Sequence, residues 1–131
     1  SCGWEKDFQL RLFRKDKVGL TQRLVHEGFI VNGKTERLKN KLIHYSYRNL
    51  FQAFEKINHY SSLQAIEKKE IKNVNSLTII SHSFSAFLKF YFTFKGYKDG
   101  VYGLLISLIN SITTMMTYAK IWEIQKIKTK N

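Results

Sequence analysis

Residues 100–119 read GVYGLLISLINSITTMMTYA, a run of twenty residues without one charged side chain. A run of this length is long enough to span a bilayer as a helix. Its polar residues recur at steps of three and four and would share one side of that helix, with apolar residues opposite. The pattern therefore favours a two-sided helix, packed on protein or lying at a lipid interface, over a spanning one. The polar side holds Ser107, Asn110, Ser111, Thr114 and Thr117, and the apolar side Leu105, Leu108, Ile109, Ile112, Met115, Met116 and Ala119.

The segment before this run is rich in aromatic residues and lysine. Rings with basic neighbours suit the head-group layer of a membrane, where the ring is half buried and the amine meets phosphate. The same rings could instead fill the core of a helical cluster, and the sequence leaves both interpretations open. They are Phe84, Phe87, Phe90, Tyr91, Phe92, Phe94 and Tyr97, with Lys89, Lys95 and Lys98 among them.

The first third of the chain has the alternation of extended structure. Residues 5–14 place apolar and polar side chains on opposite sides, which predicts a half-buried strand. A second extended piece is expected at 24–31, ending at the turn signal Asn32-Gly33. Residues 39–45 would bring the chain back.

Helical spacing dominates the rest of the chain, and no proline interrupts it. Apolar residues predict one long or two shorter helices at 47–72, a further helix at 77–94 and a last one at 102–126. The loop at 73–76 supplies an N-cap for the helix at 77–94, and Gly96 would end that helix as a C-cap. The predicted fold class is therefore α+β, with a few N-terminal strands followed by three or four amphipathic helices. We divide the chain at this change of pattern, into residues 1–47 and residues 48–131.

Composition points to an anionic partner. The chain has 22 Lys and Arg against 10 Asp and Glu, a formal charge of +12, and such a surface attracts phosphate-rich molecules. Anionic lipid, nucleic acid and a sugar nucleotide with its acceptor all fit this charge. Basic residues between aromatics also occur on nucleic-acid surfaces, but the rings here lie in apolar helical runs, so no nucleic acid is predicted as a partner. The single cysteine, Cys2, excludes an internal disulfide.

An ordered series of motifs carries a family resemblance over nearly the whole chain. The series resembles the C-terminal half of bacterial glycosyltransferases of family 2, of the type that builds lipopolysaccharide core and related cell-surface glycans. Its members are Phe8-Gln9-Leu10-Arg11-Leu12-Phe13-Arg14, Val25-His26-Glu27, His44-Tyr45-Ser46-Tyr47, Lys56, Tyr60-Ser61, Phe87-Leu88-Lys89-Phe90-Tyr91 and Gly96-Tyr97-Lys98-Asp99-Gly100-Val101-Tyr102-Gly103.

The resemblance implies a GT-A fold, of which this chain would be the C-terminal part. In that fold a separate half carries the sugar-nucleotide strands and an Asp-rich metal motif. This sequence contains no Asp-x-Asp, and its three aspartates, Asp7, Asp16 and Asp99, stand far apart. We therefore expect a fragment that lacks the nucleotide-binding half and is inactive alone. Residues 1–47 would be acceptor-side strands and loops, and residues 48–131 a helical, membrane-associating region.

The resemblance also assigns roles to individual residues. Glu27 matches the general base that takes a proton from the acceptor hydroxyl in an inverting transfer, with His26 before it. His44 matches the histidine that completes a Mg²⁺ or Mn²⁺ site. Arg11 and Arg14 would contact the phosphates of the nucleotide-sugar donor. Without the resemblance, Glu27 would be read as a strand-end residue in a salt bridge with one of these arginines.

Two hypotheses about function follow. The first is a glycosyltransferase, peripheral on the cytoplasmic face of the bacterial inner membrane, that transfers a sugar to a lipopolysaccharide or related glycan acceptor. The second is a non-catalytic basic helical module that binds a membrane or nucleic acid.

Overall fold

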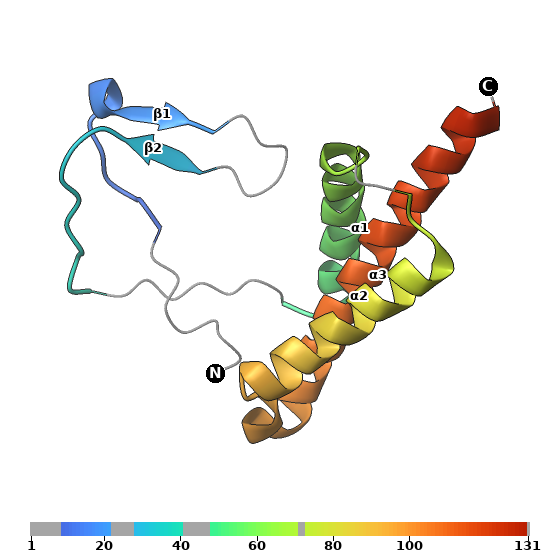
Figure 1. Ribbon diagram of the computed structural model, residues 1–131. Helices are drawn as coiled ribbons and strands as arrows, with labels where there is room; N and C mark the ends of the chain where they lie inside the picture. Colours follow the sequence, from blue (N-terminus) through green and yellow to red (C-terminus); the bar gives the residue numbers. More distant parts are fainter. Residues whose placement is uncertain (1–8, 22–27, 41–47, 71–72, 131) are drawn as a thin grey trace.

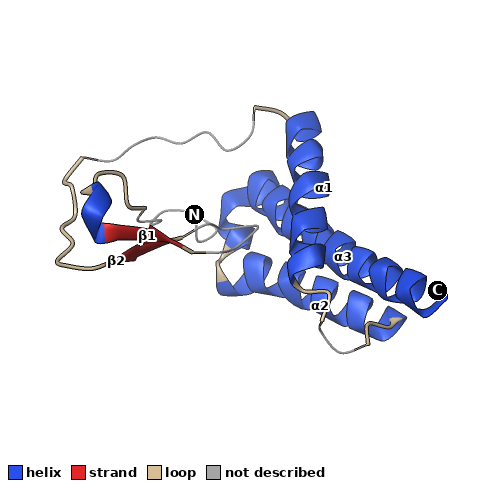
Figure 2. Cartoon of the chain, turned by 90° about the horizontal axis from the view of Figure 1, so that it is seen from above, coloured by secondary structure: helices blue, strands red, loops and turns tan. Residues whose placement is uncertain are grey.

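The computed structural model describes residues 9–21, 28–40, 48–70 and 73–130. In this part of the chain there is one two-stranded antiparallel sheet and there are three α-helices, so the α+β class is confirmed. The strands form a small hairpin that stands apart from the helices in both views (Figures 1 and 2). A GT-A arrangement is not among the described elements and stays a prediction.

The hairpin pairs β1 (Val18–Leu20) with β2 (Phe29–Val31), in the register Val18↔Val31 and Leu20↔Phe29. Gly28 N–H donates to the Thr21 hydroxyl at 2.7 Å and extends the pairing toward the turn. The predicted end at Asn32-Gly33 is confirmed, because β2 ends at Val31 and Gly33 has a φ of 145° that favours glycine.

The strand predicted at residues 5–14 is wrong where the structure describes it. Residues 9–14 form no strand, and the first strand, β1, begins only at Val18. A 3-10 turn at Lys15–Lys17 separates the two segments. Alternation alone cannot produce a strand, since a strand also needs a partner to pair its backbone. Of the return predicted at 39–45, residues 39–40 form no strand and the others lie outside the described residues.

Helix α1 spans Leu50–Glu67 without a break. Asn49 caps its start, with the side-chain oxygen accepting from the N–H of Gln52 at 2.9 Å. The sequence left one helix or two open here because polar residues occupy 58–62. Asn58, Ser61 and Ser62 contact Lys120 of α3 and the other two are exposed, so one helix accommodates all five.

Helices α2 and α3 form a hairpin. Helix α2 spans Ser76–Leu88 and begins at an Asn75 cap, within the loop 73–76 where the sequence predicts one, and the Asn75 side chain accepts from the N–H of Thr78 at 2.8 Å. It continues as a π-helix, η2, over Lys89–Thr93 and reaches a short 3-10 turn, η3, at Gly96–Asp99. Helix α3 then runs back over Gly100–Lys130. The two helices lie side by side, with the turn at one end (Figure 1).

Gly96 is not the C-cap that the sequence predicts. The left-handed residue after the π-helix is Lys95, with a φ of 58°. Gly96 is buried, and a Cβ added to Gly103 would collide with its carbonyl oxygen. Both glycines therefore serve the close approach of the turn to the first part of α3, while Gly100, with a φ of 56°, provides the backbone bend that starts α3.

The helices share a very small apolar core. Ala65, Val74 and Ile121 are buried together, and Ile79, Tyr118 and Ile124 pack against them. Many large apolar side chains of the described residues are exposed instead of joining this core, which makes the chemistry of that surface informative.

Candidate functional site

Small and polar residues line the contacts between the helices. The buried residues of α1 are Ala53, Ile57, Ser61 and Ala65, one every four residues, so they form one stripe along the helix. On α2 the buried residue is Ser83. On α3 the buried set includes Gly103, Ser107, Thr117 and Ile121. We call the four buried hydroxyl residues, Ser61, Ser83, Ser107 and Thr117, the polar seam.

Hydrogen bonds at the polar seam and beside it join the helices. The hydroxyl of Ser111 on α3 donates to the carbonyl oxygen of Ser83 on α2 at 2.8 Å. The hydroxyl of Thr117 lies 3.3 Å from the side-chain oxygen of Gln64 on α1. The Val74 N–H, just before α2, donates to the side chain of Gln125 on α3 at 3.0 Å. Polar groups therefore fix the register of the three helices.

Lys120 of α3 makes four hydrogen bonds to α1. Its ammonium group donates to the carbonyl and side-chain oxygens of Asn58 at 2.7 and 2.8 Å, and to the hydroxyls of Ser61 and Ser62 at 2.9 and 2.7 Å. The polar stretch that interrupts the apolar pattern of α1 thus receives a lysine from α3. Desolvation by burial lowers the pKa of Lys120 below its ordinary value, and the charge of Glu123 offsets part of that effect.

Large apolar residues lie on the outside of the hairpin. On α2 and η2 they follow one face at helical spacing, and on α3 they cover the side opposite the polar seam. Leu77, Val101 and Ile80 leave 72%, 70% and 66% of their surface exposed. We call this set the apolar outer surface: Leu77, Ile80, Phe84, Leu88, Phe92, Val101, Leu104, Leu105, Leu108 and Met115.

The predicted two-sided character of α3 is therefore confirmed, and its polar side is the one that faces the other helices. In a water-soluble helical protein the large apolar residues face inward and the polar residues outward. Here Ser107 and Thr117 are buried, while Leu105, Leu108 and Met115 on the opposite side are exposed. Small and hydroxyl residues between helices, with large apolar residues outside, are typical of helices packed within a bilayer.

The seven aromatic residues before α3 are not core. None of them is buried; Phe84, Phe92 and Tyr97 are exposed by 60%, 57% and 48%, and the other four are half-buried. The rings contact one another instead, as in the Phe87–Tyr91 stack at 5.4 Å. We call residues 89–102, which contain several of these rings and three lysines, the tip of the hairpin. Its opposite end, at the start of α2 and at Lys120 of α3, is the open end.

The residues predicted to carry catalysis fall mostly outside the described part of the chain. Glu27, His26 and His44 lie there, so their roles stay predictions. Arg11 and Arg14 are described, on an exposed loop and not on the predicted strand. Whether the five predicted residues come together is therefore not tested by the described residues.

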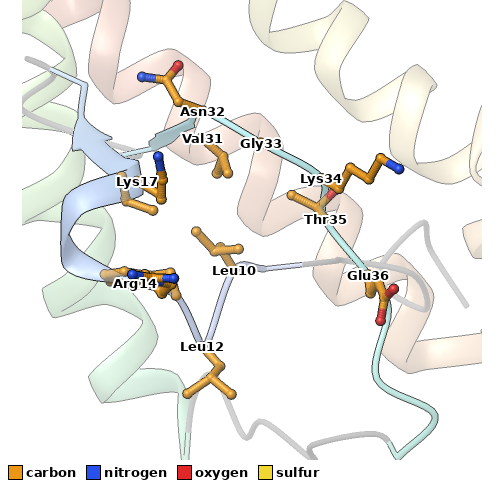
Figure 3. A pocket seen from close by; sticks show the side chains of 12 residues that line it. Leu10, Leu12, Arg14, Lys17, Val31, Asn32, Gly33, Lys34, Thr35 and Glu36 are labelled. Atoms are coloured by element: carbon orange, nitrogen blue, oxygen red, sulfur yellow. The ribbon is translucent and has the colours of Figure 1, made fainter.

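Arg14 lines a pocket beside the β1–β2 strand hairpin, and Arg11 does not (Figure 3). The pocket has a volume of about 310 Å³, with an apolar floor that includes Leu10 and basic side chains from Lys17 and Lys34. Arg14 also pairs with Asp16 at 3.4 Å, but both side chains are largely exposed, so the pair contributes little stability. The basic rim would suit an anionic group, and phosphate contact by Arg14 stays a prediction.

The described residues contain no cluster of ligands for the divalent metal that the resemblance implies. Among residues 9–21, 28–40, 48–70 and 73–130, no three His, Cys, Asp or Glu side chains gather where they could hold a metal ion. The described residues thus do not fit a metal site, and we derive no step through one.

Comparison with known proteins gives no family for the chain. No protein-family model matches it, and no solved structure matches it. The resemblance to family 2 glycosyltransferases is therefore an untested prediction, and the helical surface is the candidate site that the described residues define.

Sequence reasoning missed two features of this site. One is the contact of Lys120 with α1, which had no signal beyond the polar interruption at 58–62. The other is the close packing of α3, for which a signal existed: Gly103, Ser107 and Ser111 follow one another at intervals of four, the spacing of small residues at helix contacts in membranes.

Proposed function

We propose that residues 48–131 form a membrane-binding module, in which the apolar outer surface of the α2–α3 hairpin contacts lipid acyl chains. One observation carries this proposal: between residues 76 and 119 the buried residues are glycine, serine or threonine, and many large apolar residues are exposed. Exposed apolar patches of this extent on a soluble protein mark sites that another surface covers.

Charge favours an anionic bilayer as that surface. The chain carries a formal charge of +12, and lysines lie at both ends of the hairpin, including Lys89, Lys95 and Lys98 at the tip and Lys120 and Lys126 toward the other end. A lysine near an anionic membrane surface contributes about 1 kcal/mol to binding. Apolar contact and charge therefore act on the same partner.

Binding to lipid vesicles tests the proposal. The full chain, kept in mild detergent and then diluted into vesicles, should float with vesicles that contain anionic lipid. It should also float, more weakly, with purely zwitterionic vesicles, because the apolar contact does not depend on charge. Salt at about 1 M shortens the Debye length to about 3 Å and should remove most of the difference between the two lipids. Failure to float with either vesicle would overturn the proposal, and floating that an excess of RNA abolishes would favour nucleic acid as the partner.

Glycosyl transfer is a second proposed function, and it rests on the motif resemblance. The exposed apolar surface of α2 and α3 is the observation in its favour, because a membrane-facing surface would suit an enzyme whose acceptor is a glycolipid. In the full-length enzyme that the resemblance implies, Glu27→Gln should lower turnover by about 10²–10⁴-fold while donor binding is retained, as expected for loss of a general base. Wild-type turnover of this variant would show that the base lies elsewhere. Location on the cytoplasmic face of the bacterial inner membrane is proposed on the same ground.

A further inference from the structure

The Ser, Thr and Asn side chains in the uncharged run of α3 have hydrogen-bond partners within the protein. Between Gly103 and Tyr118, every Ser, Thr and Asn side chain donates a hydrogen bond to a backbone carbonyl. All but one of these bonds go to the carbonyl four residues earlier on the same helix. The exception is Ser111, which donates to Ser83 on α2. Because polar groups in hydrocarbon must be satisfied internally, this pattern makes the whole uncharged run compatible with lipid.

The length of the uncharged part of α3 matches the hydrocarbon layer. Exposed aromatic residues with polar ends stand at the two ends of the uncharged part of α3, with Tyr102 at the tip and Trp122 at the open end, exposed by 79% and 43%. They are about twenty residues apart, which is about 30 Å along a helix and equals the thickness of a bilayer core. Tyr and Trp collect at the two interfaces of a membrane.

The tip carries charges that cannot stay in hydrocarbon. Lys95 and Lys98 are exposed there. Lys89 is the first residue of the π-helix. Its side chain extends toward the tip, and its ammonium nitrogen lies 5.5 Å from the ring centre of Phe94. A lysine that reaches toward the nearest head-group layer in this way is typical of membrane helix ends. The tip must therefore reach a head-group layer and not stop at mid-membrane.

We infer that the α2–α3 hairpin crosses the bilayer twice, with residues 76–94 and 103–119 in the hydrocarbon, Lys89 reaching toward the head groups, and residues 95–102 of the tip at the opposite head-group layer. The inference rests on the proposed membrane function and goes beyond the peripheral association expected from sequence. Helix α3 is the one helix among the described residues that is by itself long and apolar enough for such a crossing, and the other crossing is made by α2 continued by η2. The satisfied polar groups, the two aromatic levels and the charged tip add independent support.

Charge then assigns a direction to the hairpin. Loops rich in lysine and arginine stay on the cytoplasmic side. The sequence next to the open end holds more lysines than the tip, so the open end, α1 and the strand hairpin would lie on the cytoplasmic side. These lysines are Lys68, Lys69, Lys72, Lys120, Lys126, Lys128 and Lys130.

Cysteine labelling tests the crossing. In a Cys2→Ser background, single cysteines are placed at the tip (Lys98→Cys) and beyond the open end (Lys126→Cys), with Lys17→Cys on the strand side as a matched control. Each variant is inserted into sealed vesicles and treated with a membrane-impermeant maleimide. Lys126→Cys and Lys17→Cys should label without detergent. Lys98→Cys should label only after detergent opens the vesicles.

Each result decides between the proposals. Equal labelling of the tip without detergent, in protein that floats with the vesicles, would overturn the crossing and leave the hairpin lying in the interface. Protein that does not float at all would overturn the membrane function itself. If Lys98→Cys lacks the helical circular dichroism of the parent, Tyr97→Cys replaces it as the tip variant.

Discussion

Replacing Leu77, Ile80 and Phe84 by serine tests whether the apolar outer surface contacts lipid. These side chains lie on one face of α2 and leave 72%, 66% and 60% of their surface exposed. Full burial of such a side chain is worth about 1.5–3 kcal/mol, so the exposed part is worth about 1–2 kcal/mol each. The triple variant should lose about 3–6 kcal/mol of membrane affinity, or about two to four orders of magnitude in the partition coefficient.

Flotation over a titration of zwitterionic lipid measures this loss without a contribution from anionic head groups. The matched control replaces Leu20, Ile30 and Leu38 by serine, because these residues are exposed to a similar degree, 66%, 56% and 75%, on the strand hairpin and its following loop. The control should partition like the parent, and both variants should keep the helical circular dichroism signal in detergent. Unchanged partition of the helical variant would refute lipid contact, and loss of its helical signal would show that the residues hold the fold.

The remaining predictions concern the stability of the helices, measured by chemical unfolding in detergent micelles and followed by circular dichroism. Gly103→Ala should cost about 2–4 kcal/mol, because its Cβ would collide with the Gly96 carbonyl, whereas Gly19→Ala, with open space around it, should stay within about 0.5 kcal/mol of the parent; equal effects would place the glycine contact in doubt. Lys120→Met should cost about 1–3 kcal/mol, since it leaves the acceptors on α1 without their donor, and no change would mean that the ammonium group does not join α1 to α3. Asn75→Ala should cost about 1 kcal/mol through loss of the α2 cap; a neutral result would contradict that cap.

The positions of the helices were largely predictable from the sequence, because apolar spacing and capping residues are local signals. An N-cap within the loop 73–76 was correctly expected, and the predicted stretches overlap α1, α2 and α3, with ends that differ by up to six residues. The strand at residues 5–14 was wrong, since strand formation depends on a partner that local pattern does not specify. The role of Gly96 was also wrong, because its purpose is a contact with Gly103 on the next helix.

The candidate site was predictable only in part. The two-sidedness of α3 could be read from its residues, but which side faced inward depends on what surrounds the helix. Local pattern is the same for a helix with its apolar side in a protein core and for one with that side in lipid. The polar contacts of Lys120 depend on side chains about sixty residues away in the sequence, a separation beyond any local signal. The catalytic residues Glu27 and His44 remain predictions, as they lie outside the described residues.

The α2–α3 hairpin has small and hydroxyl residues between its helices and large apolar residues outside, and this reverses the usual tolerance of a protein to substitution. In a soluble helical protein, most amino-acid substitutions are tolerated at the surface and few are tolerated in the core. Along α2 and α3 the outer positions should accept any large apolar residue, because acyl chains adapt to its shape, and should reject only charge. The inner positions, such as Gly103 and Ser107, should accept almost nothing larger, because the neighbouring backbone already fills the space. Natural variation should therefore be broad in apolar identity on the lipid side and narrow in volume along the seam.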